Sequence, residues 1–432
     1  MLAATVPLTG HVHPMQLVVR ALVEAGHEVM WYGAGKFRPK IEATGATFAP
    51  MRAAPDWDDA DVEAALPALR GKRGLARVKV QLREMFIAPM GHQLRDLDEL
   101  AASFAPDVVL ADQAHLGAAL LAEHRQLPWA GLGISAFVFP SVDTAPFGAA
   151  RPPAKNDADR KVYRFLNWLI NRVLFRAVNR AYHEGRVAAG LPAGAQTYFD
   201  VLSPDLFLQP TIPSFEYPRS DLPPQVQFIG PLVPRGTGGE LPSWWGDLVD
   251  ATAAGTPIIV VTQGTLATDP RELIGPALKA LAGERVLVIA TTSADARALG
   301  MDALPANARI APYIPYERLL PHTRVLVTNG GYGGVQMALG HGVPMVIAGG
   351  SEEKPEIAAR VAWSGVGIDL RTGRPRPHKI LRAVRRVLEE PAFQQRARTL
   401  ADETARYDAP RAAVASIEQL VERQRGARME VA

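Results

Sequence analysis

The sequence predicts an α/β protein built from two doubly wound parallel sheets, one in each half of the chain. Three observations lead to this prediction. A chain of 432 residues is too long for one hydrophobic core, so its length favours two domains. Short apolar runs alternate with amphipathic helical stretches from end to end, which is the pattern of βαβ units. A Pro- and Gly-rich stretch over 215–245 separates two such series, and this arrangement predicts a cleft between the halves.

The composition excludes several classes of protein. With 48% hydrophobic and 21% charged residues, the chain can bury a core and is not disordered. The formal net charge of +3 comes without a dense basic stripe, so nucleic acid is not expected as a partner. Cysteine is absent, which excludes disulfides, thiolate metal sites and a catalytic thiol, and suits a cytoplasmic protein.

The sequence shows no membrane-spanning or secretory segment. Apolar runs such as 256–262 fall short of the roughly 18 residues needed to cross a bilayer. The N-terminus lacks a basic region and a long apolar core, so no signal peptide is predicted. The first strand begins at Leu2, which leaves open an upstream start.

In the first half, the apolar pattern predicts one parallel sheet with strands over 2–6, 28–32, 107–111 and 129–132 and helices over 13–25 and 116–123. Gly26 stands where a helix C-cap is needed. Two helical excursions, over 52–97 and 137–190, interrupt this series without strands of their own. We expect them to cross the sheet's C-terminal edge and line an apolar pocket with large side chains, namely Met85, Phe86, Met90, Phe165, Trp168 and Phe175. For any one of these side chains a role in the core remains an alternative.

The same pattern restarts after the Pro- and Gly-rich stretch, with strands predicted over 257–262, 286–291, 325–328 and 343–348 and helices over 271–281, 335–339 and 356–365. A last amphipathic helix is predicted over about 411–425. We therefore divide the chain into a first domain (1–222), a linker (223–245), a second domain (246–408) and a C-terminal helix (409–432) that packs back toward the first domain.

Two loops of the second half indicate an anion site. Residues 328–334 read Thr-Asn-Gly-Gly-Tyr-Gly-Gly between a strand and a helix, so the backbone can approach a ligand and the helix N-terminus points free N–H groups at it. The loop lacks the Lys-Ser/Thr ending of a P-loop. A second loop, Thr-Gln-Gly-Thr over 262–265, follows a strand of the same sheet. Two converging loops favour a diphosphate, although glycines that serve packing and ordinary ST-turns remain alternatives.

His11 and Asp112 form the candidate acid–base pair of the first half. His11 follows the first strand within Gly-His-Val-His-Pro over 10–14, and Asp112 ends a later strand of the same sheet. Both are expected at the sheet's C-terminal edge, with His11 exposed there. A neutral imidazole held by a carboxylate suits removal of a hydroxyl proton. A structural role for the histidine is the alternative.

These motifs together resemble one family over essentially the whole chain. The Gly-His-Val-His-Pro segment, the glycine-rich loop and Gly342-Val343-Pro344 are similar to the inverting GT-B glycosyltransferases, in particular the bacterial macrolide and natural-product enzymes related to UDP-glycosyltransferases. The resemblance implies a GT-B fold, an acceptor-binding first domain and a second domain that binds a nucleotide sugar. It implies no metal and no cofactor besides that co-substrate, and a monomer or homodimer with no membrane insertion.

The resemblance also assigns roles to residues. His11 corresponds to the general base and Asp112 to its orienting carboxylate. The donor is expected to contact Thr265, Tyr313, Ile314, Asn329, Gly331, Gly333, Gly334, Gln336, Glu353 and Lys354. The acceptor is expected to contact Met85, Phe86, Met90 and Phe137.

Five positions of the expected donor site depart from the family pattern. Tyr313 replaces the usual Trp that stacks on the base, and Asn329 replaces the usual His of the diphosphate loop. Met337 stands where a Glu commonly grips the ribose, which leaves neighbouring Gln336 for that contact. Glu353-Lys354 replaces the Asp-Gln pair that holds the donor sugar, so the donor's identity is open.

The sequence therefore favours inverting transfer of a hexose from a UDP-sugar to a hydroxyl of a small apolar acceptor. A dTDP-deoxysugar transferase and a non-catalytic partner of a true transferase are alternatives. A transferase acting at a lipid surface is a further one, which rests on basic residues at roughly helical spacing, namely Arg70, Lys72, Arg73, Arg77, Lys79 and Arg83.

Overall fold

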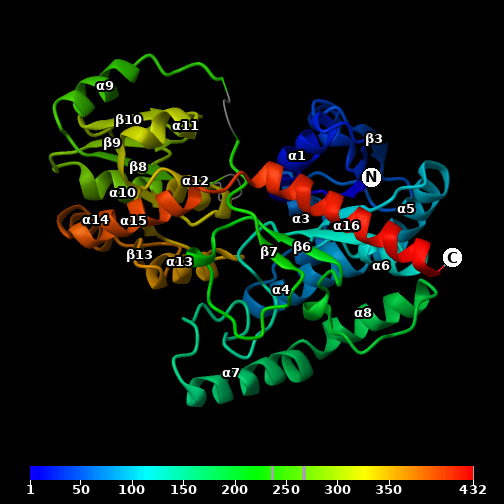
Figure 1. Cartoon of the computed structure of the whole chain (residues 1–432). Helices are drawn as coiled ribbons and strands as arrows, with labels where there is room; N and C mark the ends of the chain where they lie inside the picture. The colour runs from blue at the N-terminus through cyan, green and yellow to red at the C-terminus, as the bar shows by residue number, and fades with distance from the viewer. Residues whose placement is uncertain (235–237, 265–268, 432) are drawn as a thin grey trace.

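The computed structural model describes residues 1–234, 238–264 and 269–431 as two α/β domains, each on a parallel sheet (Figure 1). The first sheet has seven strands in the order β3-β2-β1-β4-β5-β6-β7, and the second has six in the order β10-β9-β8-β11-β12-β13. In each sheet the strand order reverses beside the first strand, β1 or β8, which is the doubly wound arrangement. The predicted fold class is confirmed.

The strands of the first sheet are β1 (Leu2–Ala4), β2 (Met30–Gly33), β3 (Thr47–Pro50), β4 (Val109–Asp112), β5 (Trp129–Leu132), β6 (Leu206–Gln209) and β7 (Val226–Phe228). Its helices are α1 (Thr9–Glu24), α2 (Arg38–Glu42), α3 (Val62–Ala65), α4 (Gly74–Gln81), α5 (Met90–Phe104), α6 (Leu116–Arg125), α7 (Asp157–Leu169) and α8 (Arg176–Ala188). Two π-helical segments, η4 (Leu82–Ile87) and η5 (Ile170–Leu174), continue α4 and α7. Short 3-10 turns occupy η1 (Gly35–Phe37), η2 (Asp59–Asp61), η3 (Pro67–Leu69), η6 (Tyr198–Asp200) and η7 (Pro213–Phe215).

The strands of the second sheet are β8 (Ile258–Thr262), β9 (Leu287–Thr291), β10 (Ala308–Ala311), β11 (Thr323–Thr328), β12 (Met345–Ile347) and β13 (Gly367–Asp369). Its helices are α9 (Trp245–Ala253), α10 (Ile274–Leu281), α11 (Tyr316–Leu319), α12 (Tyr332–Gly340), α13 (Lys354–Trp363), α14 (Pro377–Glu389) and α15 (Pro391–Thr404), with a 3-10 turn η8 (Leu320–His322). The last helix is α16 (Ala409–Val431).

The central strands form because short apolar runs are covered on both faces. Every residue of β1, β4, β5, β6 and β8 is buried, as expected for parallel strands between helical layers. The strand β1 pairs with β4 so that Ala4 lies opposite Ala111. The segments that follow these two strands therefore begin side by side at one edge of the sheet.

Helix α1 begins four residues earlier than predicted, at Thr9. Its first N–H groups need acceptors, and Asp59 supplies one: Thr9 N donates to Asp59 Oδ2 at 2.6 Å. The carboxylate also complements the positive end of the helix dipole. His11 consequently lies in the first turn of α1 rather than in a loop.

The first sheet extends beyond residue 222. Strand β7 falls inside the stretch that we predicted as linker and hydrogen-bonds to β6, so the first domain's sheet continues to Phe228. The Pro and Gly residues around β7 are compatible with a strand because it is a three-residue edge strand with a single neighbour.

The two domains pack directly on each other, and α16 returns to the first. Ala136, Ile212 and Phe215 of the first half join the hydrophobic core that covers one face of the second sheet. Helix α16, red in Figure 1, lies beside α1 and buries Ala413 and Ile417 in the first domain's core.

Candidate active site

His11 and Asp112 meet at the C-terminal edge of the first sheet. Asp112 ends β4, His11 lies in the first turn after β1, and His11 Nδ1 is 3.0 Å from Asp112 Oδ1. A carboxylate can only accept hydrogen bonds, so Nδ1 carries a proton, and in the neutral imidazole Nε2 keeps its lone pair. The structure thus brings together the two residues that the sequence predicts as a pair.

Asp112 is fixed as an ion in a fully buried position. Its Oδ2 accepts from Val6 N at 2.8 Å, and its Oδ1 also accepts from Ala114 N at 2.8 Å. Burial alone would raise the pKa of Asp112, but the His11 charge and hydrogen bond, with those of nearby donors, hold it below the ordinary value. The carboxylate can therefore hold His11 in one tautomer and stabilise an imidazolium.

His11 is less exposed than predicted. Its side chain is 10% exposed, because the Phe86 ring of η4 stacks near it with centroids 6.5 Å apart. Phe86 belongs to a π-helical segment, and such segments often occur at functional sites. An apolar ring beside the imidazole gives this side of the site the character expected of an acceptor pocket.

The glycine-rich loop leaves open space in front of helix α12. A side chain at Gly331 or Gly333 would meet no atom within 4 Å. Gly331 is the N-cap of α12 and makes no side-chain cap, so the first N–H groups of the helix point into that space. Gly330 has φ +89° and packs closely on Ile347, which explains why glycine is needed there.

A cavity of about 350 Å³ lies at the C-terminal edge of the second sheet, between the loops that follow β8, β11, β12 and β13. Asn329 and Lys354, both predicted donor residues, line it together with Gln263, Ser351 and Arg374. Asn329 Nδ2 donates to Gln263 O, while its Oδ1 is buried without a partner among the described residues. A buried acceptor without a donor marks a place where a ligand hydroxyl or N–H group can bind.

Glu353 and Lys354 stand at the N-terminus of α13, which follows β12. Burial raises the pKa of Glu353, and the charge of Glu352 adds to that effect, whereas the charge of His11 lowers it. Lys354 is buried, donates to Glu352, and its backbone lies against Gly330. These contacts place Lys354 beside the glycine loop.

The remaining predicted donor residues fall in different environments. Tyr313 is 63% exposed just after β10, whereas its neighbour Ile314 is buried in the core. Gln336 does not reach the loop opening, because it is buried and its Oε1 accepts from Thr211 of the first domain at 3.1 Å. Thr265 lies outside the described residues.

The predicted acceptor residues also fall into two groups, one beside His11 and one buried in the core. Phe86 lies beside His11, whereas Met85 of the same π-helical segment is buried. Met90 is buried against Gly185 of α8, and Phe137 is buried in an aromatic cluster with Phe139 and Phe207. Neither presents surface to an acceptor. Phe165 and Trp168, which we expected in a pocket, are instead 58% and 55% exposed, because α7 lies at the outer edge of the molecule (Figure 1).

The sequence did not reveal two buried polar groups near the site. His115 caps α6 through Nδ1, which accepts from Ala118 N at 3.1 Å, and burial lowers its pKa to about 4. In the second group, Arg360 of α13 pairs with Glu216 and with Glu356 at 2.8 and 2.9 Å. His115 stands three residues after Asp112, before an apolar helical run, and this N-cap position was the available signal. In the Arg360 group, only the spacing of Glu356 and Arg360 by one helical turn was visible, because Glu216 lies 144 positions away.

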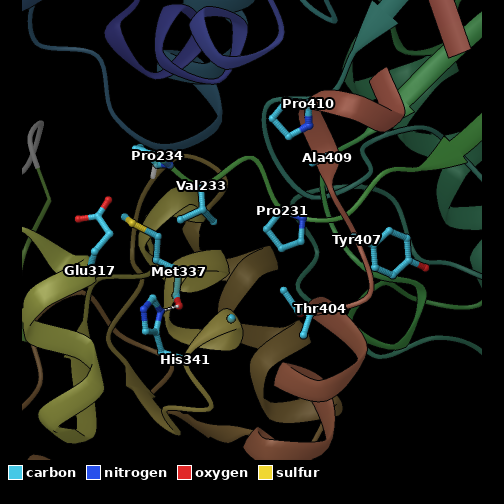
Figure 2. A pocket seen from close by; sticks show the side chains of 12 residues that line it. Pro231, Val233, Pro234, Glu317, Met337, His341, Thr404, Tyr407, Ala409 and Pro410 are labelled. Atoms are coloured by element: carbon cyan, nitrogen blue, oxygen red, sulfur yellow. Dashed lines mark hydrogen bonds between the residues drawn. The ribbon is translucent and has the colours of Figure 1, made fainter. Parts of the chain in front are cut away.

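A second cavity, of about 380 Å³, lies where the chain crosses between the domains. Figure 2 shows Val233 and Pro231 of the linker on one side and, on the other, Met337 of α12 and His341, which follows that helix, with Pro410 at the start of α16. The two residues of the acid–base pair are not among its lining residues. It is separate from the cavity beside the glycine loop.

Among the described residues, no cluster of three or more His, Cys, Asp or Glu side chains could hold a metal ion. In the same part of the chain, none of the helices has the length and apolar character to pass through a bilayer.

Comparison with known proteins gives consistent matches. Residues 277–420 match the family described as "Erythromycin biosynthesis protein CIII-like, C-terminal domain". The chain is 44% identical over 423 residues to 4'-demethylrebeccamycin synthase of Lentzea aerocolonigenes, which covers 97% of this chain and 99% of that protein. It is 32% identical over 437 residues to UDP-glucosyltransferase A1 of Starmerella bombicola, covering 97% and 92% respectively.

Solved structures show the same architecture at lower identity. The calicheamicin glycosyltransferase CalG4 superposes with a TM-score of 0.73 at 21% identity, over 98% of both chains. The glycosyltransferase VinC in complex with dTDP superposes with a TM-score of 0.70 at 21% identity, over 98% of this chain and 99% of that one.

Proposed function

This chain belongs to the glycosyltransferases of natural-product biosynthesis and has their GT-B fold, and from that membership we propose that it transfers a hexose from a UDP-sugar to a hydroxyl of a small apolar acceptor, with inversion at the anomeric carbon. The observation that carries the proposal is the buried His11–Asp112 pair at the C-terminal edge of the first sheet. It supplies a base with a free Nε2 next to the loops suited to a nucleotide sugar.

In the proposed reaction, the acceptor hydroxyl binds near Phe86 and gives its proton to His11 Nε2. The hydroxyl oxygen forms a bond to the anomeric carbon while the bond from that carbon to the diphosphate oxygen breaks. The electron pair leaves with the nucleoside diphosphate. Asp112 stabilises the imidazolium that results. One displacement from the face opposite the leaving group inverts the configuration.

The leaving diphosphate needs donors that are already in position. The N–H groups at the start of α12 and the dipole of that helix supply them. The Asn329 side chain adds a polar group but no charge. Tyr313 remains free to stack on the base, because it is largely exposed. These donors stabilise charge that develops as the bond to the sugar breaks.

Two observations bear on the donor nucleotide. Relatives named UDP-glucosyltransferases or UDP-glycosyltransferase are 31–33% identical over more than nine-tenths of this chain, which favours a UDP-sugar. Structural neighbours bound to thymidine diphosphate (dTDP) are only 20–21% identical. A dTDP-sugar is therefore the second candidate. The hypothesis of a non-catalytic partner protein is set aside, because the chain belongs to a family of named glycosyltransferases.

The test is a transfer assay with a permissive phenolic acceptor and a donor panel that includes UDP-glucose and dTDP-glucose. We expect UDP-glucose to give the higher kcat/KM, and NMR coupling constants to show a β-glucoside formed from the α-linked donor. A product that retains the α configuration would refute the single-displacement mechanism, and a preference for dTDP-glucose would reverse the donor assignment.

A further inference from the structure

Exposed apolar side chains gather on one part of this protein. Eight of the eleven large hydrophobic residues that are exposed in the described structure lie on α4 and on the continuous segment α7–η5–α8, namely Leu75, Val78, Val162, Phe165, Trp168, Val173, Leu174 and Val187. The other three, Val249, Tyr313 and Trp363, lie in the second domain. Such clustering differs from the scattered exposure that is normal for a protein surface.

The centre of this surface is an aromatic pair on α7. The rings of Phe165 and Trp168 stack with centroids 5.9 Å apart and an interplanar angle of 26°. The same helix holds the protein through its other side, where Tyr163 donates to Pro152 O and Asn167 donates to Thr144 O. The helix thus satisfies its inward contacts and still presents two aromatic rings outward.

Positive charge surrounds the apolar residues. Neither 70–83 nor 160–183 contains an Asp or Glu, and the acidic residues of these helices, Asp157, Asp159 and Glu184, lie at or near their outer ends. In the second stretch, five exposed basic residues make no ion pair with any described residue, namely Lys161, Arg164, Arg172, Arg176 and Arg180. Lys79 of α4 lies 5.9 Å from the centroid of Phe175, which joins the two segments into one surface. We call this surface, formed by α4 and α7–η5–α8, the basic aromatic face.

We propose that the basic aromatic face docks the enzyme on an anionic phospholipid surface. Aromatic and aliphatic side chains enter the boundary between head groups and acyl chains, and the surrounding Arg and Lys side chains pair with anionic head groups. Their long alkyl stems let the charged ends reach the phosphates while the rings sit deeper. Binding at the bilayer surface in this way does not require a membrane-spanning helix.

The positive charge of the basic aromatic face makes a second copy of this chain an unfavourable partner for it. Two such faces in contact would bring together several unpaired cations from each side, and desolvating like charges at close range is unfavourable. An anionic bilayer presents the opposite charge over a broad surface and accepts apolar rings as well.

Docking through this face also has a consequence for the reaction, which goes beyond the proposed function. Helix α4 continues directly into η4, and η4 carries Phe86 beside His11. The face that meets lipid is therefore continuous with the segment next to the base. An apolar acceptor dissolved in the bilayer would be close to its site.

The test measures co-sedimentation of the full chain with vesicles. One set contains phosphatidylcholine alone, and the other contains about 30% phosphatidylglycerol. We expect binding only to the anionic vesicles, with clear weakening in about 0.5 M NaCl because salt screens the head-group charge. Equal binding to both vesicle sets, or binding to neither, would overturn the proposal.

Two variants test whether the basic aromatic face is the part of the protein that contacts lipid. The double variant Phe165→Ser/Trp168→Ser and the triple variant Arg164→Glu/Arg172→Glu/Arg176→Glu should each lose at least about tenfold in vesicle affinity. Val249→Ser and Arg382→Glu, exposed positions of the second domain, are the matched controls and should bind as wild type. Transfer to a water-soluble phenol should be unchanged in all four variants. A loss of vesicle binding is therefore distinguishable from a failure of the proposed transfer activity.

Sedimentation equilibrium of the same proteins without lipid completes the design. A dimer that the aromatic double variant abolishes would assign this face to self-association and overturn the lipid proposal. A monomer in both proteins, together with vesicle binding lost only in the face variants, supports it.

Discussion

At the scale of single residues, Asp112 determines what His11 can do. The carboxylate is buried and accepts hydrogen bonds from two backbone N–H groups as well as from the imidazole. The backbone bonds fix its position, so the imidazole is oriented by a group that cannot move. A base needs this preorganisation because proton transfer depends on distance and angle.

Asp112→Asn should lower kcat by about 10²-fold or more, with a smaller effect on KM, because the amide neither fixes the tautomer nor stabilises the imidazolium. Steady-state kinetics with saturating donor measures this. Asp205→Asn is the control, since Asp205 also accepts a backbone N–H of the same sheet, from Trp129. A kcat within about twofold of wild type would show that Asp112 is only structural.

His115 predicts a pH dependence of stability. Burial lowers its pKa from 6.5 to about 4. As the pH falls from 6.5 to about 4, the unfolded chain takes up a proton that the folded chain does not, so the free energy of unfolding decreases by up to about 3 kcal/mol.

His115→Asn keeps an acceptor at the helix N-cap and removes the titration. Its urea-derived free energy of unfolding should fall less than that of wild type between pH 7 and pH 4.5. His124→Asn, half-exposed on the same helix, should keep the wild-type slope. Equal slopes in wild type and His115→Asn would contradict the assignment of this titration to His115.

At the scale of elements, the open space in front of helix α12 depends on glycines that make no packing contact. A Cβ at Gly333 meets no atom within 4 Å, so the missing side chain leaves space for a ligand. Gly330 is different, since its positive φ and its contact with Ile347 are structural requirements. The two kinds of glycine cannot be separated in the sequence alone.

Gly333→Leu should weaken UDP binding by at least about tenfold, because the side chain fills the space in front of the helix N-terminus. Leucine favours a helix over glycine by up to about 1 kcal/mol, so Tm should be equal or higher. Isothermal titration with UDP and a thermal melt measure both. Gly246→Leu in α9, also with free space around it, should bind UDP normally. Unchanged affinity in Gly333→Leu would remove α12 from the nucleotide site.

The elements that the sequence predicted are those with long or two-sided apolar patterns. Strands such as β4 and β8 are buried on both faces and were found. Edge strands were missed: β3, β7, β10 and β13 have three or four residues, are partly exposed and pair on one side only. The central strand β6, Leu-Phe-Leu-Gln over 206–209, was also missed, although its short apolar run is typical of a buried strand.

The same reasoning explains which site residues could be predicted. His11 and Asp112 lie 101 positions apart in sequence, yet each follows a strand of one sheet and the strands are neighbours, so topology brings them together. The stacking of Phe86 near His11 depends on a π-helical segment without a sequence signature. Gln336 and Phe137 were assigned by resemblance, and tertiary packing buries both.

At the scale of the whole molecule, helix α13 links the domains. Its first residues carry Lys354 beside the glycine loop, while Glu356 accepts N–H groups from Gly148 and Ala150 of the first domain. One turn further, Arg360 pairs with Glu216 at 2.8 Å. The cavity beside the glycine loop is therefore held at a defined position relative to the first domain.

Arg360→Met should destabilise the protein by about 3 to 5 kcal/mol, since it leaves Glu216 and Glu356 buried without their partner. Differential scanning calorimetry should show a lower Tm and, because the domains lose a shared contact, a broader or divided transition. Arg385→Met is the control: its pair with Glu284 is largely exposed and should cost less than about 1 kcal/mol. A loss as small as that of the control would show that the buried group does not couple the domains.

The central claim is that His11 takes the proton from the acceptor while the second domain holds the nucleotide sugar. Replacing His11 by Ala separates these two roles. The variant should bind UDP with the affinity of the wild type in isothermal titration, and its kcat for transfer to a phenolic acceptor should fall by at least about 10²-fold. Turnover near the wild-type rate with intact UDP binding would contradict the account.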